Sequence, residues 1–234
     1  MPWDFVAIFL VLGILLPWKG YTRLRSLLAM PQITALDRLS LYASTIAFQW
    51  VAATIVAWRS WAHGFTPADL GFLPVNRRSG VLLATVLGGL ALFFVQWLNV
   101  RRMSRLPPES RGRMQSLAEH ILPHTNLEML VFVALCVSAA VCEEFIYRGF
   151  AIAALARWGW PPIGTIAATS GLFALGHLYQ GRRGVLTTLI LGVLFSCVRL
   201  SYDGLFPVIA WHGSIDVAAG FAGMRYLQYN ELSR

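Results

Sequence analysis

The sequence predicts an all-α fold, a polytopic membrane bundle of about seven to eight transmembrane helices. Hydrophobic residues make up 57% of the 234 residues and charged residues only 13%, whereas charged residues are about a quarter of a typical soluble domain. The apolar residues are also collected into runs that are long enough for a helix to cross the ~30 Å hydrocarbon core of a bilayer. These two observations exclude a soluble domain and indicate an integral, multi-pass membrane protein.

Seven apolar runs are assigned as spans in chain order, at residues 3–18, 39–58, 81–100, 127–157, 163–179, 185–200 and 205–224. The first run ends at Pro17 and lacks the basic residues that precede the apolar part of a signal peptide, so we expect it to be retained as a span. Residues 19–38 are expected to form a loop or an interfacial helix. Residues 101–126 are expected to be a polar connection with a surface helix around 111–120. Arg182 and Arg183 are expected in a loop before the sixth span.

The net charge of +8 does not indicate a nucleic-acid partner, because the basic residues sit in short clusters between the apolar runs. Alternate connections contain thirteen Lys and Arg residues against five, a bias that places the C-terminus in the cytoplasm and the N-terminus outside. The expected surroundings are therefore a lipid bilayer. Three cysteines, Cys136, Cys142 and Cys197, all fall in apolar runs, and we interpret them as small buried residues without a disulfide framework.

Charged residues inside the fourth run indicate a site, because each charge at the centre of a membrane helix costs roughly 2.5–3.5 kcal/mol. Glu144 and Arg148 are four residues apart, so they share a helix face and can form an ion pair. Glu143 points about 100° away from Glu144 and needs a partner from another part of the chain.

Two later runs also contain polar residues at helical spacing. His177 follows Phe173 by four residues, and Asp216 follows His212 by four. Each of these residues could be satisfied separately by a backbone or side-chain partner. Charged residues at depth face one another or a water-filled cavity, however, and separate sites would multiply the energetic cost. We therefore predict one buried cluster formed by Glu143, Glu144, Arg148, His177, His212 and Asp216.

The order and spacing of these residues resemble a known family. Glu143-Glu144-x-x-x-Arg148, Phe173-x-x-x-His177 and His212-x-x-x-Asp216 are similar to the motifs of the CPBP family of intramembrane proteases, also called the ABI family. This family includes the type II CAAX prenyl endopeptidase and bacterial relatives such as bacteriocin-immunity proteins. The resemblance covers residues 127–224 and implies a catalytic core there, after N-terminal helices and basic loops in 1–126 and before a tail in 225–234. All three parts are expected to form one integrated domain in the bacterial inner membrane.

The resemblance and the residue types together predict an intramembrane endopeptidase. Glu143 would act as general base, His177 would help to hold the water, and His212 would donate to the oxyanion. Asp216, where the type II prenyl endopeptidases carry Asn, would fix the tautomer of His212. Glu144, Arg148 and Phe173 would support the site. No cofactor is needed by this mechanism, and the substrate would be a membrane protein or peptide, lipidated if the family name applies.

Three alternatives remain at this point. Glu143, His177 and His212 together are the ligand set of a catalytic zinc, which would make the protein a metalloprotease with Glu144 as the base. Buried acids and imidazoles could also form a proton or ion relay in a transporter. The fold could finally serve as a binding or immunity scaffold without activity.

Overall fold

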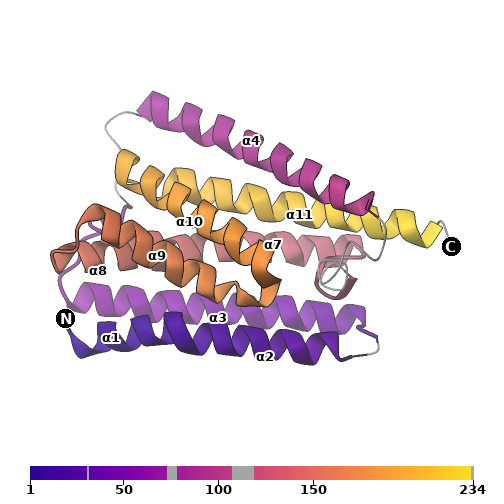
Figure 1. Ribbon diagram of the computed structural model, residues 1–234, viewed down its shortest axis with the longest axis horizontal. Coiled ribbons are helices and arrows are strands. Elements are labelled where there is room, and N and C mark those ends of the chain that lie inside the picture. Colours follow the sequence, from indigo (N-terminus) through magenta and orange to yellow (C-terminus); the bar gives the residue numbers. More distant parts are fainter. Residues whose placement is uncertain (31, 73–77, 107–118, 233–234) are drawn as a thin grey trace.

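A computed structural model describes residues 1–30, 32–72, 78–106 and 119–232, and every regular element in these ranges is helical. The long helices lie side by side along the long axis of the molecule (Figure 1). Five helical segments are long and apolar enough to cross a membrane, namely Trp3–Leu28, Ala35–Ala62, Gly80–Met103, Asn126–Arg157 and Leu178–Tyr202. The prediction of an all-α polytopic membrane bundle is therefore confirmed.

The first helical segment is longer than the sequence suggested. It consists of α1 (Trp3–Leu10), the π-helical turn η1 (Val11–Leu15) and α2 (Leu16–Leu28). The predicted end at Pro17 is wrong, and residues 19–28 of the segment 19–38, predicted as a loop or an interfacial helix, continue the same helix. A proline inside a helix normally clashes with the carbonyl group four residues earlier, here that of Gly13. The wider π turn lies at this point, so the chain passes Pro17 without ending the helix.

The next two helices agree with the predicted second and third spans. Helix α3 (Ala35–Ala62) begins at a capping box in which the Thr34 side chain accepts from the Asp37 backbone and the Asp37 carboxylate accepts from Thr34. Helix α4 (Arg78–Ser104) packs along α11 (Phe206–Leu232) (Figure 1). The predicted surface helix around 111–120 falls almost entirely outside the described residues.

The predicted long helix 127–157 is confirmed and is the most enclosed part of the bundle. It consists of α7 (Asn126–Glu144), the π-helical segment η2 (Phe145–Ala151) and α8 (Ile152–Arg157). Buried residues make up 56% of its apolar window, against 17–22% in the other four candidate spans. Gly149 permits close approach of the connection that follows α3, since an added Cβ would lie 3.0 Å from the carbonyl oxygen of Leu70.

The last part of the chain departs from the predicted boundaries. Helix α9 (Pro162–Gly176) ends before His177, a 3₁₀ turn (Leu178–Gln180) follows, and α10 (Gly181–Tyr202) begins at once. Arg182 and Arg183 therefore lie in the first turn of α10 and not in a loop, which corrects the prediction. The 15 residues of α9 extend only ~22 Å, and the helix ends partway along the bundle (Figure 1). That α9 and α11 cross the bilayer remains a prediction.

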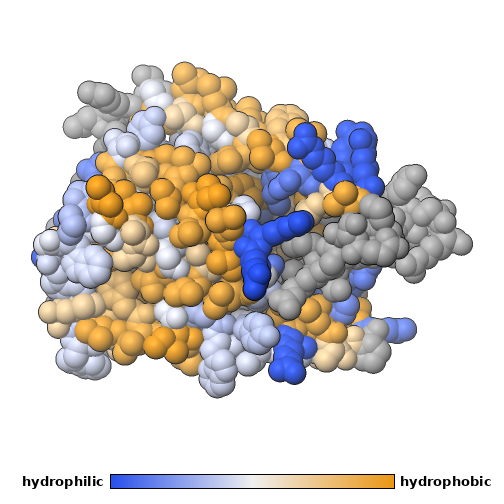
Figure 2. All heavy atoms as spheres, in the orientation of Figure 1, coloured by the Kyte–Doolittle hydropathy of each residue, from blue (hydrophilic) through white to orange (hydrophobic). Residues whose placement is uncertain are grey.

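The outer surface is suited to a lipid environment. Large apolar side chains are exposed on many helices, including Trp3 at 80% and Ile163 at 82%. Apolar residues cover much of the face in Figure 2, and strongly hydrophilic side chains gather toward the end where α2 and α4 terminate. Cys136 and Cys142 are buried as predicted, whereas Cys197 is exposed, so that part of the cysteine prediction is wrong.

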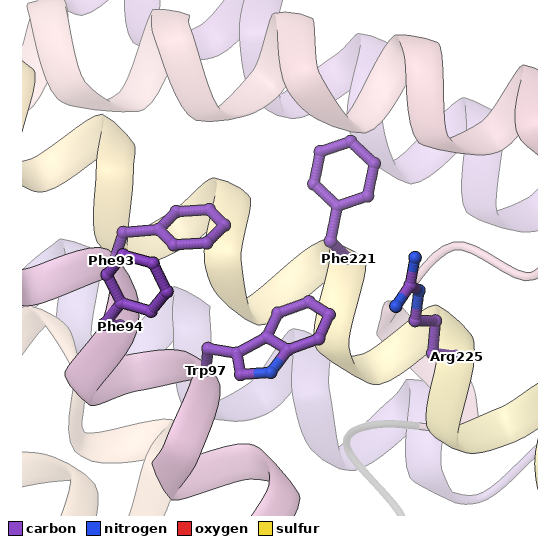
Figure 3. A pocket seen from close by; sticks show the side chains of 5 residues that line it. All are labelled: Phe93, Phe94, Trp97, Phe221 and Arg225. Carbon is purple, nitrogen blue, oxygen red and sulfur yellow. The ribbon is translucent and has the colours of Figure 1, made fainter. Parts of the chain in front are cut away.

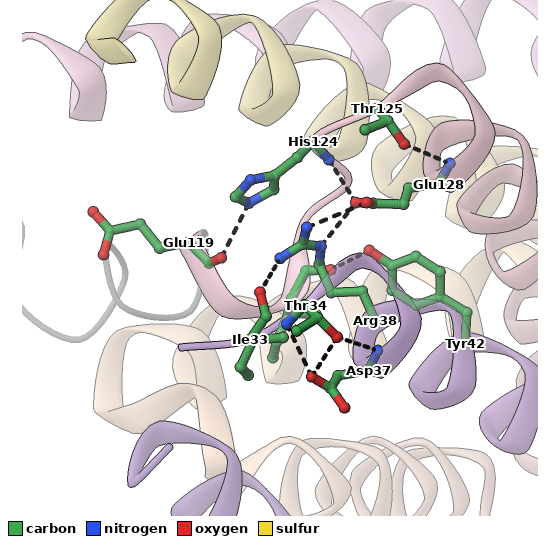
Figure 4. A network of polar contacts seen from close by, with 10 residues as sticks. Ile33, Thr34, Asp37, Arg38, Tyr42, Glu119, His124, Thr125 and Glu128 are labelled. Carbon is green, nitrogen blue, oxygen red and sulfur yellow. Dashed lines mark hydrogen bonds and ion pairs between the residues drawn. The ribbon is translucent and has the colours of Figure 1, made fainter. Parts of the chain in front are cut away.

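Two features lie outside the predicted cluster. A groove of about 400 Å³ between α4 and α11 is lined by four aromatic residues and one arginine, Phe93, Phe94, Trp97, Phe221 and Arg225 (Figure 3). A polar network joins the start of α3 to the start of α7 (Figure 4). At its centre Arg38 donates to both carboxylate oxygens of Glu128, with Nε 2.7 Å from Oε2. The backbone N–H of His124 donates to the same Oε2.

Candidate active site

The centre of the site is the buried carboxylate of Glu144, which accepts hydrogen bonds from an arginine and a histidine. Arg148 Nη1 is 2.8 Å from Oε1 of Glu144, and both side chains are fully buried. The predicted ion pair on one helix face is therefore confirmed. His212 Nδ1 lies 2.8 Å from the same Oε1, so α11 is joined to the junction of α7 and η2. Glu144 thus contacts both the arginine and the histidine, a link to His212 that helix spacing alone did not predict.

The aromatic ring of Phe173 lies between the members of this cluster. The guanidinium carbon of Arg148 is 4.2 Å from the centre of the Phe173 ring, a cation–π geometry. The rings of His177 and His212 lie 4.5 Å and 6.0 Å from the same ring. Tyr147 meets it edge-on at 5.3 Å. Phe173 on α9 therefore contacts side chains of η2 and α11, and both imidazoles lie near its ring.

His177 is held by its own helix end. It is the C-cap of α9, and its Nδ1 is 2.8 Å from the carbonyl oxygen of Phe173. A carbonyl can only accept, so Nδ1 carries the proton and Nε2 of the neutral ring presents a lone pair. The predicted sharing of a helix face by Phe173 and His177 is confirmed. This tautomer is the one that can accept a hydrogen bond from a water molecule.

Glu143 has a partner that the sequence analysis did not name. Nε2 of Gln49, in the middle of α3, donates to Oε1 of Glu143 at 3.1 Å. Glu143 is half-buried, in contrast to Glu144. Gln49 is neutral, so a search for ionisable residues could not find it. The available signal was a carboxamide in the middle of the apolar run 39–58.

Asp216 lies on the other side of the His212 ring. Its Oδ2 is 3.4 Å from Nε2 of His212, and its side chain is 34% exposed. The Nδ1 contact to Glu144 is much shorter, so Glu144 is the stronger partner in orienting the imidazole. From the sequence, this orienting role was predicted for Asp216 alone. Because the contact to Asp216 is long, Nε2 is the nitrogen of His212 that can donate a hydrogen bond to another acceptor.

The side chains of the proposed zinc alternative do not form a metal-binding group. Among the described residues, no three or more His, Cys, Asp or Glu side chains are arranged to hold a metal ion. Both ring nitrogens of His212 face carboxylates, and Nδ1 of His177 faces a backbone carbonyl. A metalloendopeptidase is therefore not supported by this arrangement.

Ionisable residues gathered inside a helical membrane bundle mark a functional site. Residues 125–218 match the family model of the type II CAAX prenyl endopeptidase Rce1-like proteins. The matched segment contains all six residues of the predicted cluster and confirms the resemblance to the CPBP family of intramembrane proteases. At the level of the family, the match supports an intramembrane endopeptidase of the CAAX type for this part of the chain. No curated protein and no solved structure matches the chain. The match gives no support to a transporter or an immunity scaffold.

Proposed function

We propose that this protein hydrolyses a peptide bond of a membrane-associated substrate by a glutamate-type mechanism in which Glu143 and His177 activate water. The contact between Nδ1 of His177 and the carbonyl oxygen of Phe173 is the observation that carries this proposal. The Nδ1–H of His177 is held by the Phe173 carbonyl, which leaves Nε2 as an acceptor for one hydrogen of the water. Oε1 of Glu143 accepts the hydrogen bond from Gln49, so Oε2 is the oxygen that takes the second proton of the water.

The chemistry requires one water and no further reactant. As the water oxygen bonds to the peptide carbonyl carbon, Glu143 accepts its proton and the carbonyl oxygen becomes an oxyanion. Nε2 of His212, whose contact with Asp216 is long, donates to this oxyanion. Glu143 then gives the proton to the amide nitrogen, the C–N bond breaks, and the products are a carboxylate and an amine. Glu144 and Arg148 hold His212 in place from the opposite side.

The substrate class follows from the family and the surroundings. A site enclosed by membrane helices meets proteins or peptides that are held at the bilayer, and the family description names a CAAX prenyl endopeptidase. We infer that a membrane-anchored peptide, with or without a lipid on its C-terminal segment, is the substrate. The expected location is the bacterial inner membrane.

The experiment that tests the proposal replaces Glu143 with glutamine. Purified protein in liposomes is given a membrane-anchored reporter peptide, once prenylated at a C-terminal CAAX sequence and once without the lipid. Glu143→Gln is expected to abolish cleavage while insertion and purification remain normal, because it removes the base with little change in volume. Asp203→Asn makes the same carboxylate-to-amide change at an exposed position and should keep full activity. Undiminished cleavage by Glu143→Gln would show that another residue is the base.

A further inference from the structure

Gln49 connects the N-terminal helix α3 to the candidate active site through a hydrogen bond. It lies on α3, outside the segment 125–218 that matches the family, and its amide nitrogen donates to Glu143 at 3.1 Å. The neighbouring Trp50 also contacts α7, where its indole N–H donates to Oγ of Ser138 at 3.1 Å. Of these two adjacent residues, Gln49 donates to Glu143 and Trp50 donates to Ser138.

The orientation of the Gln49 amide is fixed by its partner. A carboxylate accepts hydrogen bonds and cannot donate them when ionised, so the NH₂ group and not the carbonyl oxygen must face Glu143. A cation at this position would also hold the carboxylate, but it would stabilise the charged form far more strongly and weaken the base. A neutral donor orients Glu143 and leaves the second carboxylate oxygen for the reaction.

The same amide group has an unfavourable feature. Oε1 of Gln49 is buried and has no hydrogen-bond partner among the described residues. Burying an acceptor without a partner costs free energy, and this cost offsets much of the gain from the bond to Glu143. An apolar side chain of similar size would avoid the cost. The contribution of Gln49 to folding stability is therefore small, and the reason for an amide here lies in its effect on Glu143.

We propose that Gln49 is a positioning residue that locks the Glu143 carboxylate in the rotamer that reacts with water. This inference rests on the proposed function of Glu143. The hydrogen bond holds Oε1 toward α3 and thereby keeps Oε2 directed at the water. Loss of the bond leaves the carboxylate present but free to rotate, so the chemical step slows and substrate binding does not change.

The test compares Gln49→Leu, Gln49→Glu and Trp50→Phe in the liposome cleavage assay, with Tm measured for each. Gln49→Leu removes both polar groups of the amide, and we expect kcat to fall about 10- to 100-fold, as is typical for residues that orient a reactive group, with KM within about twofold. Its Tm should equal that of the wild type, because the bond and the unpaired acceptor disappear together. Gln49→Glu keeps the shape but replaces the donor with an acceptor, and its kcat should fall further.

Trp50→Phe is the matched control, since it removes a different hydrogen bond between α3 and α7, the one to Ser138, and should change Tm more than kcat. An unchanged kcat in Gln49→Leu would overturn the inference. A rise in KM at unchanged kcat would also overturn it and make Gln49 a substrate contact. A fall in Tm as large as that of Trp50→Phe, together with lower activity, would show a purely structural role. Activity that survives Glu143→Gln would remove the proposed function itself, whereas loss there with full activity in Gln49→Leu would reject the Gln49 inference alone.

Discussion

Replacement of Arg148 by methionine should destabilise the protein strongly, because it leaves the Glu144 carboxylate buried without its cation. Both side chains are completely inaccessible, and Nη1 lies 2.8 Å from Oε1. Removing one partner of a buried ion pair typically costs about 3–5 kcal/mol. His212 still donates to the same Oε1, which places the expected loss near the lower value, about 3 kcal/mol.

Two further contributions of Arg148 act in opposite directions. The contact with the Phe173 ring is lost, and a desolvated cation–π contact is worth about 2 kcal/mol. Nε and Nη2 of Arg148 are buried without a partner among the described residues, so their removal recovers free energy. These terms nearly cancel, and the ion pair determines the result. For a chain of this length, a loss of about 3 kcal/mol corresponds to a decrease in Tm of roughly 6–12 °C.

The assay is thermal unfolding of the purified variants in one detergent at pH 7. Arg199→Met is the matched control, since Arg199 is also buried but the Asp203 carboxylate that it pairs with is 89% exposed and stays solvated. Its Tm should fall less. Arg148→Met combined with Glu144→Gln should recover part of the loss, because the unpaired charge is then gone. A Tm for Arg148→Met within 2 °C of the wild type would refute the reasoning that Glu144 depends on this arginine.

Further predictions concern other parts of the molecule. Arg38→Met should lower Tm, since it leaves the buried Glu128 without its cation, and cleavage per folded molecule should be unchanged in the reporter assay. Hydrogen bonds from the backbone N–H and the hydroxyl of Thr66 lower the pKa of Asp69, so the stability that Asp69 contributes is present above the ordinary pKa of 3.8 and is lost as pH falls through the lower folded value. The difference in Tm between wild type and Asp69→Asn should therefore disappear in acid. Asp216→Asn should keep kcat within about tenfold, because its contact to His212 is long. In a cysteine-free background, Tyr179→Cys should react with a membrane-impermeant thiol reagent from the cytoplasmic face only, and labelling from the other face would contradict the predicted topology.

The extent of the helices was predictable from hydropathy where the chain is regular and less so where the backbone departs from α geometry. The run 127–157 is one helix as expected, although seven of its residues are π-helical. Pro17 was taken as a helix end because a proline usually breaks the α-helical hydrogen-bond pattern. The π turn before it is a property of the folded backbone, and no residue type in that run signals it.

The site was predictable where its members are ionisable and follow helical spacing. Glu144 with Arg148 and Phe173 with His177 are pairs within one helix, and their contacts follow from a separation of four residues. Gln49 is 94 residues from Glu143 and is uncharged, so neither spacing nor charge connects the two. The bond from His212 to Glu144 likewise depends on how α11 packs against α7, which a single sequence does not specify.

The short helix α9 explains how the two histidines come together. The sequence places His177 near the end of one span and His212 early in another, so regular spans would hold them at different depths. Helix α11 begins at Phe206, six residues before His212. Helix α9 ends after ~22 Å, and the chain turns back into α10 at Gly181, whose φ of 78° is easily adopted only by glycine. His177 at the end of α9 thus lies four residues after Phe173, and the rings of His177 and His212 are 4.5 Å and 6.0 Å from the Phe173 ring.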